Sequence, residues 1–403
     1  MTSRPDLHPA IANLSPDRLA KGLYWQRSWN VVTGCSHVSP GCDNCWCERE
    51  AARLARHPNP KISGRFDNSI LNMDGGWTGK VLLNDAALEL PLRTRKPTVF
   101  AVWTDLFHES VMFESIDKVF AVMALAPQHL FLVLTKRPKR METYLTHCML
   151  RERTEDWADA LAHGAYRLFG EQAECAVANA INGVLAEGHN VGWPMRNAIL
   201  MATVEDQPRA DERMPHMMEL AGMGWKTGVS IEPMLGPVNL DRIHESGESE
   251  HGMHWESWES CLTGKRFDIW ADQETGGFPR LSWVVCGGES GPHARPMHPD
   301  WVRSLRDQCQ AAGVPFLFKQ WGEWVPSENF PSDRKFKRWK EFLQGVDEPQ
   351  PLCTTGAHYD ANAKRFGEKI AFGPFTLMAW AGKHTAGRRL DGQTHDAFPE
   401  VKG

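Results

Sequence analysis

Four of the ten cysteines lie close together in the stretch GCSHVSPGCDNCWCERE, at positions 35, 42, 45 and 47. Clustered cysteine thiolates bind zinc, hold an iron–sulfur cluster or pair in disulfides. The chemistry of this stretch therefore depends on the compartment in which the chain folds and on how many of the four thiols converge.

The chain shows no feature that predicts export. Its start, MTSRPDLHPAIANL, lacks the basic residues and apolar core of a signal peptide. No stretch approaches the ~18 apolar residues of a membrane span. We therefore expect a cytoplasmic protein without a membrane partner. Structural disulfides are rare in a reducing cytoplasm, so the clustered cysteines indicate metal or redox chemistry.

The spacing of the cysteines favours an iron–sulfur cluster. A structural zinc site takes four ligands, usually as two separated pairs, and the pairs Cys35/Cys42 and Cys45/Cys47 would be unusually spaced for it. A 4Fe–4S cluster can take three protein thiolates, in the spacing C-x6-C-x2-C, and leave one iron open. Zinc, or a set of unrelated buried or reactive thiols, remains an alternative.

The fourth cysteine falls in a predicted helix. The sequence WCEREAARLARH after Cys45 has a helical pattern, with Asp43 or Asn44 as its expected N-cap. A residue two positions beyond Cys45 points about 200° round such a helix, so Cys47 should face away from the shared site. The helix N-terminus would stabilise thiolates and the negative charge of a cluster.

The elements that must position this stretch are short, buried strands. Near-continuous apolar runs of this length are typical of strands covered on both faces, and helical patterns at 116–125 and 300–312 lie between some of them. An Asp cap is expected at Asp300 and a stop at Gly313. Strands that alternate with helices predict a parallel sheet of about seven strands, as a partial or complete TIM-like (β/α) barrel. The runs are 29–32, 99–103, 130–134, 198–202, 228–231, 283–286 and 315–318.

Polar residues follow these runs at the carboxyl ends of the predicted strands, where barrel active sites lie. We expect them to line one cavity that binds a cofactor or substrate, although each could instead cap a loop or form a salt bridge. Glu232, Glu289 and Lys319 are the catalytic candidates, and the glycines beside Glu289 permit close approach to a ligand. The cofactor-binding candidates are Asp105, Lys136, Thr203, Glu205, Glu232, Gly287, Gly288, Glu289 and Gln320. By contrast, His293, His298 and Trp321 are expected to be packing or rim residues.

The composition allows a large globular fold. The 403 residues are 42% hydrophobic and 24% charged, and the net charge of −5 gives no overall attraction to nucleic acid. We expect a barrel over 1–325, interrupted by a helical insertion at about 147–192 and a lid or mobile loop at about 241–280. Residues 326–403 would form an extension packed on the barrel.

Several stretches together resemble a known family. The chain is similar to the phage "gp thirty-seven / gp sixty-eight" three-cysteine-motif family, a domain of unknown function. The resemblance runs in order along almost the whole chain. It rests on WNVVTGCSHVSPGCDNCWCERE, VFAVWTDLFHESV, LVLTKRP, ATVEDQPRADERMP, VSIEPMLGPVNL, VVCGGESGPHARPMHPDWVRSLRDQCQAAGVPFLFKQWGEW and AGRRLDGQTHDAFPE.

The resemblance implies a chemistry for the cysteines. This family is distantly similar to radical S-adenosylmethionine enzymes, so Cys35, Cys42 and Cys45 would hold a 4Fe–4S cluster whose open iron binds S-adenosylmethionine. One electron would then release a 5′-deoxyadenosyl radical. An external electron donor, a phage partner protein and the host cytoplasm are further expectations.

The substrate implied by the phage context is a nucleic acid or nucleotide, which would be modified or repaired. Basic runs at 135–140 and 335–340 and the many tryptophans could supply phosphate contacts and base stacking, although such runs are more often solvated surface. The alternative function is a non-catalytic cysteine-cluster module, with zinc or iron–sulfur, that binds nucleic acid or protein.

Overall fold

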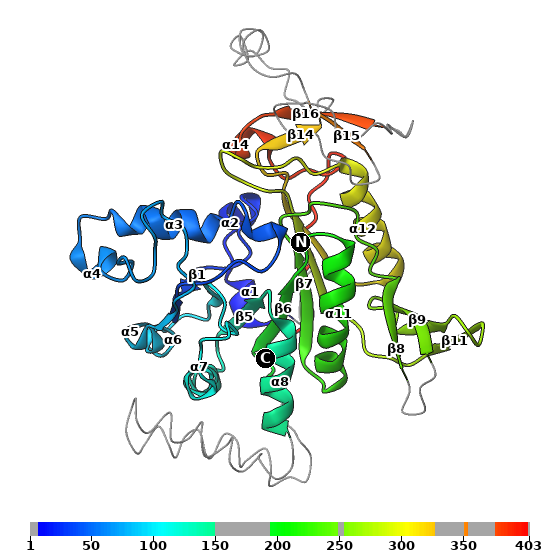
Figure 1. The fold of residues 1–403 in the computed structure, drawn as a ribbon, viewed down its shortest axis with the longest axis horizontal. Helices are drawn as coiled ribbons and strands as arrows, with labels where there is room; N and C mark the ends of the chain where they lie inside the picture. Colours follow the sequence, from blue (N-terminus) through cyan, green and yellow to red (C-terminus); the bar gives the residue numbers. More distant parts are fainter. Residues whose placement is uncertain (1–6, 150–193, 249–253, 327–349, 354–374, 402–403) are drawn as a thin grey trace.

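A curled, all-parallel sheet forms the centre of the molecule. The computed structural model describes residues 7–149, 194–248, 254–326, 350–353 and 375–401. Within these residues seven parallel strands lie in the order β1-β4-β5-β6-β7-β12-β13, and the sheet bends into a half-barrel (Figure 1). The predicted α/β fold with a partial TIM-like barrel is confirmed. The strands are β1 Arg27–Trp29, β4 Val99–Val102, β5 Leu130–Thr135, β6 Ala198–Thr203, β7 Lys226–Ile231, β12 Trp283–Gly287 and β13 Phe316–Gln320.

Apart from β1 at the edge of the sheet, the strands are buried on both faces, which explains the lack of polar alternation in their sequences. In β5, Phe131 and Val133 belong to the core between sheet and helices. Their neighbours Leu130 and Leu132 belong to a second core inside the curl of the sheet. Helices thereby cover the outer face of the sheet. On the inner face, the polar groups lie at the carboxyl ends of the strands.

Helices lie in most connections between successive strands, as parallel pairing favours, whereas strands alone are described between β7 and β12. The main helices are α7 Phe113–Leu125, α8 Pro138–Met149, α11 Gln207–Gly222 and α12 Pro299–Ala312. The helices expected at 116–125 and 300–312 lie within α7 and α12. The N-cap of α12 is His298 and not Asp300, since Pro299 is favoured at the first helical position and moves the start upstream. Among the described helices, none is both long and apolar enough to cross a bilayer.

The amino end of the half-barrel is filled by both ends of the described chain. Side chains of the segment containing α1 Pro9–Ala12 and α2 Pro16–Ala20 pack inside the curl, and Tyr24 follows them there. From the other end of the chain, Val401 joins the same core. Because these groups occupy the amino end, only the carboxyl end of the inner face remains hollow.

The insertion at 241–280 is a small sheet and not the loop or lid expected. It contains four antiparallel strands, β8 Ile243–Glu248, β9 His254–Ser260, β10 Lys265–Asp268 and β11 Gln273–Gly276, which project from the side of the molecule (Figure 1). Its strands carry polar residues on both faces, so their periodicity is weak. The insertion expected at 147–192 lies outside the described residues beyond Met149.

The remaining elements are short. In the predicted extension and just before it, β14 Trp324–Pro326, β15 Gln350–Cys353 and β16 Phe375–Trp380 form one sheet. β2 Val32–Thr33 pairs with β3 Leu82–Leu83 beside the cysteine stretch. The others are η1 Pro40–Cys42, α3 Trp46–Ala55, α4 Pro60–Ser63, α5 Asp85–Leu88, α6 Leu90–Arg93 and α14 Lys383–Ala386.

Candidate active site

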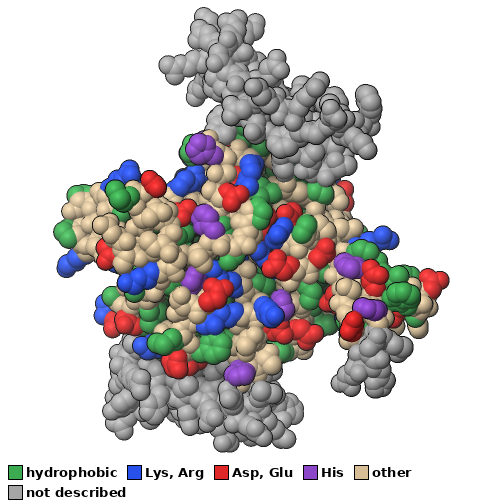
Figure 2. Space-filling view, in the orientation of Figure 1, with side chains coloured by type: hydrophobic (Ala, Val, Ile, Leu, Met, Phe, Trp, Pro, Cys, Tyr) green, Lys and Arg blue, Asp and Glu red, His purple; other side chains and the backbone are tan. Residues whose placement is uncertain are grey.

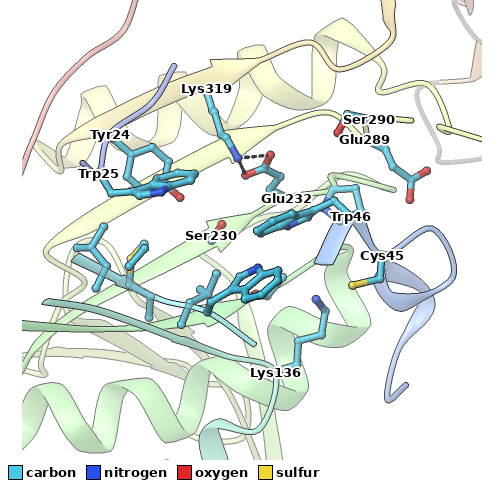
Figure 3. Close-up of a pocket in the computed structure, with 18 of the residues that line it drawn as sticks. Tyr24, Trp25, Cys45, Trp46, Lys136, Ser230, Glu232, Glu289, Ser290 and Lys319 are labelled. Atoms are coloured by element: carbon cyan, nitrogen blue, oxygen red, sulfur yellow. Dashed lines mark hydrogen bonds and ion pairs between the residues drawn. The ribbon is translucent and has the colours of Figure 1, made fainter. Parts of the chain in front are cut away.

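A cavity of about 140 Å³ opens at the carboxyl end of the inner face (Figure 3). Strand residues form its apolar wall, among them Ala101, Leu132 and Met201. The cysteine stretch closes one side with Cys45 and Trp46. In Figure 3 the sulfur of Cys45 and the ammonium group of Lys136 point toward the same space. The cavity therefore joins the strand ends to the cysteine stretch.

An ion pair crosses the cavity opposite the cysteine. The Nζ atom of Lys319 lies 2.7 and 2.8 Å from the two carboxylate oxygens of Glu232 (Figure 3). The same ammonium lies 5.9 and 5.2 Å from the ring centroids of Tyr24 and Trp25. Burial, followed by the charge of Glu232, raises the pKa of Tyr24, which keeps its phenol neutral. This wall thus offers a fixed carboxylate–ammonium pair flanked by aromatic rings.

The structure brings only part of the predicted set of strand-end residues to the cavity. Those that line it are Lys136, Thr203, Glu232, Gly288, Glu289 and Lys319. Those that do not line it are Asp105, Glu205, Gly287 and Gln320. Gln320 lies behind the wall, where its amide is 3.3 Å from Glu232. Asp105, Glu205 and Gln320 lie outside the cavity and support the residues around it through hydrogen bonds.

Asp105 holds the ends of β4 and β5 together. Its carboxylate accepts hydrogen bonds from the Thr135 hydroxyl at 2.6 Å and from Arg137 at 2.8 Å, with both members of the ion pair buried. Arg137 also donates to the hydroxyl of Ser36 at 2.7 Å. The cysteine stretch is thereby tied to the end of β5 through a buried guanidinium.

Glu205 ties the middle of the cysteine stretch to β6. It is fully buried, pairs with Arg213 at 3.0 Å and accepts a 2.6 Å hydrogen bond from the hydroxyl of Ser39. A Cβ atom added at Gly41 would lie 2.3 Å from its carboxylate oxygen, so only glycine fits there. The Ser-Pro-Gly turn therefore packs directly on a buried carboxylate.

Glu289 makes the third attachment, from β12. Its carboxylate accepts hydrogen bonds from the Asn44 amide at 3.1 Å and from two nitrogens of Arg295 at 2.7 and 2.9 Å. Arg295 in turn donates to the carbonyl of Pro40 at 2.8 Å. Three separate strand ends thus fix the cysteine stretch above the cavity.

The cysteine stretch enters its helix at Cys45, which is the N-cap of α3. Neither Asp43 nor Asn44 caps this helix, because Asn44 donates to Glu289 and Asp43 pairs with Arg295 at 3.2 Å instead. Cys45 has no side-chain capping bond, so its sulfur remains available to the cavity.

The thiols at positions 35 and 45 are harder to ionise than an ordinary cysteine. Burial, with the charge of Asp105, raises the pKa of Cys35 to about 12, and burial also raises the pKa of Cys45. A charge on Cys45 would raise the pKa of Cys35 further, and a charge on Cys42 would do the same for Cys45. Charges on Cys45 and Cys35 would likewise raise the pKa of Cys47, so the thiols of the stretch are electrostatically coupled.

Cys47 is more deeply buried than Cys45, which packs against the same hydrophobic cluster. It is buried in a small hydrophobic cluster with Ala51, Ile70 and Trp103, and this burial raises its pKa well above the ordinary value. The Cys35 and Cys42 side chains do not line the cavity, whereas Cys45 does.

A single-ion site is not formed by these side chains. Within the described ranges, no three His, Cys, Asp or Glu side chains converge closely enough to hold one metal ion. A four-iron cluster makes a different demand, because each thiolate binds its own iron at a separate corner.

Sequence reasoning missed the aromatic residues of the site. Tyr24 and Trp25 lie before β1. Trp46 directly follows Cys45, and Trp103 directly follows β4. Such short aromatic stretches form no periodic pattern in the sequence. Only the fold shows that these aromatic residues line the same cavity. Of the three expected packing or rim residues, His298 and Trp321 are buried and His293 is exposed, and none of them lines the cavity.

The fold and site define a half-barrel α/β protein with a cysteine stretch fastened over a cavity at its carboxyl end. The chain belongs to a family described as a protein of unknown function, DUF5131, whose profile matches residues 21–399. Comparison with curated proteins and with solved structures gave no match.

Proposed function

We propose that this protein is an iron–sulfur enzyme of the radical S-adenosylmethionine type. The observation that carries the proposal is the fastening of the cysteine stretch to three strand ends, which sets Cys45 into the wall of the cavity. Barrel enzymes place their chemistry at this end of the strands. A merely structural metal site would not need an adjoining cavity.

Three cysteines would hold the cluster. Cys35, Cys42 and Cys45 fit it as donors, because they follow one another in a single fixed stretch, interact electrostatically and have a nearby cation in Lys136. A bound metal deprotonates a coordinating thiol outright. When bound, the cluster and S-adenosylmethionine would supply one-electron cleavage of the sulfonium and a 5′-deoxyadenosyl radical.

The chain's own residues would orient the cofactor and exclude water. Glu232 and Lys319 form a buried pair that can exchange its internal bond for the carboxylate or amino group of a ligand. Glu289 is already held by Arg295 and Asn44, so it serves to position the cysteine stretch rather than to exchange protons. Thr203 and Lys136 complete the polar lining.

The finer expectations belong to the same proposal. A phage origin, action in the host cytoplasm, an external electron donor and a nucleic acid or nucleotide substrate are consistent with a one-electron enzyme of this type. A phage partner protein could deliver that electron or the substrate.

Metal analysis of anaerobically purified protein tests the proposal. We expect a brown protein with about four irons per chain, and, after reduction with S-adenosylmethionine, release of 5′-deoxyadenosine. Cys45→Ala should abolish both the cluster and the product, whereas Cys47→Ala, the matched control, should retain them. A colourless protein with one zinc per chain would overturn the enzyme and favour a non-catalytic cysteine-cluster module.

A further inference from the structure

A second hollow adjoins the cavity at the open edge of the sheet. This groove has a volume of about 490 Å³ and shares Ser28, Trp46 and Trp103 with the cavity. Strand ends of β1 and β4 form one side of it, and α3 forms the other. The α3 residues in it are Trp46, Arg49, Glu50, Arg53 and Leu54, which lie on one face of the helix.

Three residues that line the groove carry buried polar atoms without partners. The indole Nε1 of Trp103 and the amide Oδ1 of Asn30 are buried and have no hydrogen-bond partner, and the same holds for Nε of Arg49. Trp103 is only 7% exposed, so its unpaired donor lies where water does not compensate it. Unpartnered buried polar groups are costly, which makes their gathering in one groove informative.

The residues that carry the donor and the acceptor are neighbours across the strand pair. Trp29 of β1 pairs with Val102 of β4, and the backbone N–H of Trp103 donates to the carbonyl of Trp29 at 3.1 Å. Asn30 and Trp103 are the next residues along these two strands. A ligand edge that carries an acceptor next to a donor would satisfy both atoms together, as the hydrogen-bonding edge of a nucleobase does.

The rest of the groove suits the other parts of a nucleotide. The Trp46 indole is 52% exposed and lies with its ring centroid 6.1 Å from that of Trp103. An exposed indole is a stacking platform for a base. Arg53 is held by a surface ion pair with Glu50, which contributes little and can be exchanged for a phosphate.

We propose that this groove binds a nucleobase that carries a 5′-phosphate, from a free nucleotide or from a single-stranded nucleic acid. The base stacks on Trp46 and bonds with Asn30 and Trp103, and the phosphate pairs with Arg53. Because Nε1 of Trp103 and Oδ1 of Asn30 are buried in the unbound protein, the Trp46 side chain rotates to let the base reach them. The assignment of the groove as a substrate site rests on the proposed function, whereas the binding of a nucleotide to the groove does not depend on it.

Calorimetric titration of the anaerobically purified protein tests the groove. The probes are the four nucleoside 5′-monophosphates and an eight-nucleotide single-stranded DNA. Binding of the monophosphates indicates a free nucleotide, and binding of the DNA alone indicates a nucleic acid. Loss of base stacking in Trp46→Ala should weaken binding roughly 5- to 100-fold, while Trp46→Phe should keep most of it. Asn30→Ala should weaken it about fivefold.

The control is Trp270→Ala, which removes another exposed indole, on the projecting sheet. It should bind like the unaltered protein. The proposal is overturned if no probe binds, if Trp46→Ala binds normally, or if S-adenosylmethionine displaces the probe competitively, since the groove would then be part of the cofactor site. Binding that depends on Trp46 in a protein without iron would retain the groove and reject the proposed enzyme.

Discussion

At the scale of single residues, the site depends on a few charges that are buried in pairs. Glu232 and Lys319 are 17% and 12% exposed, so the cavity holds an ion pair with little solvent around it. Gln320 gives Glu232 one additional donor. Removing one member of such a pair costs more than removing both, because the remaining charge loses its compensation.

We expect Lys319→Met to lower the free energy of unfolding by about 3 kcal/mol, since Glu232 is then left with only an amide donor. The double variant Glu232→Gln/Lys319→Met should recover at least half of that loss. Urea unfolding of the three proteins measures both values. A single variant as stable as the unaltered protein would show that water already solvates this pair.

Asp117 provides a pH-dependent contribution to stability. Its pKa is raised to about 6, chiefly by burial, although it accepts a 2.7 Å hydrogen bond from Tyr144. A raised carboxyl pKa means that the folded protein binds the proton more tightly than the unfolded chain. The contribution is therefore fully present below pH ~4 and is lost as pH rises through ~6.

Asp117→Asn should remove this loss. Between pH 4 and 7 the free energy of unfolding of the variant should gain about 2 kcal/mol relative to the unaltered protein. The comparison is made by urea unfolding at pH 4, 5.5 and 7, with Asp67→Asn as a matched surface control. A difference that does not change with pH would contradict the raised pKa.

At the scale of elements, the cysteine stretch has little regular structure of its own. It contains only a single short turn, η1, before α3 begins. Its conformation is instead set by hydrogen bonds to Arg137, Glu205 and Glu289 at three strand ends. The positions of the thiols therefore depend on the sheet, because the strand ends supply the hydrogen-bond partners of the cysteine stretch.

Loss of one attachment should loosen the stretch. Ser39→Ala removes the hydrogen bond to the buried carboxylate of Glu205 and should cost about 2 kcal/mol of stability. In metal-free protein we expect faster alkylation of Cys42 and Cys45 by iodoacetamide, followed for each cysteine by mass spectrometry. Ser63→Ala, on the exposed end of α4, is the control and should leave the rates unchanged. Equal rates in both variants would argue against the tether.

At the scale of the whole molecule, the half-barrel is completed by its own chain. The carbonyl of Ala397 accepts a 2.8 Å hydrogen bond from Trp283, and the backbone of Phe318 bonds with His395 at 3.0 Å. Arg388 and Asp396 form a further ion pair beside β13. The segment 387–401 thus covers the outer strand β13 and the inner core, where an open sheet edge would otherwise be exposed.

Deletion of residues 394–403 should therefore destabilise the barrel and not only its end. We expect loss of cooperative unfolding or a midpoint at markedly lower urea concentration, because Trp283 and the edge of β13 become exposed. Deletion of 402–403 alone is the control. If the longer deletion unfolds like the unaltered protein, the segment is not part of the core.

Apolar runs and their polar ends were enough to predict the sheet, because strands buried on both faces require hydrophobic residues at nearly every position. They were also enough to bring Glu232, Glu289 and Lys319 to one cavity. The capping residues of α3 and α12 were not predictable, since Pro299 and the tertiary contacts of Asn44 decide them. The projecting sheet was missed because its strands are polar on both faces.

The attachments of the cysteine stretch also constrain when it can form. Ser39 and Glu205 are 166 positions apart, and Asn44 and Glu289 are 245 positions apart. Contacts so distant along the chain form late, after the intervening strands have been placed. A chain emerging from the ribosome therefore lacks the last of the three attachments until β12 and Arg295 have been synthesised. Loading of the proposed cluster would then be one of the last steps of biogenesis, and a chain that stops short of β12 should fail to retain it.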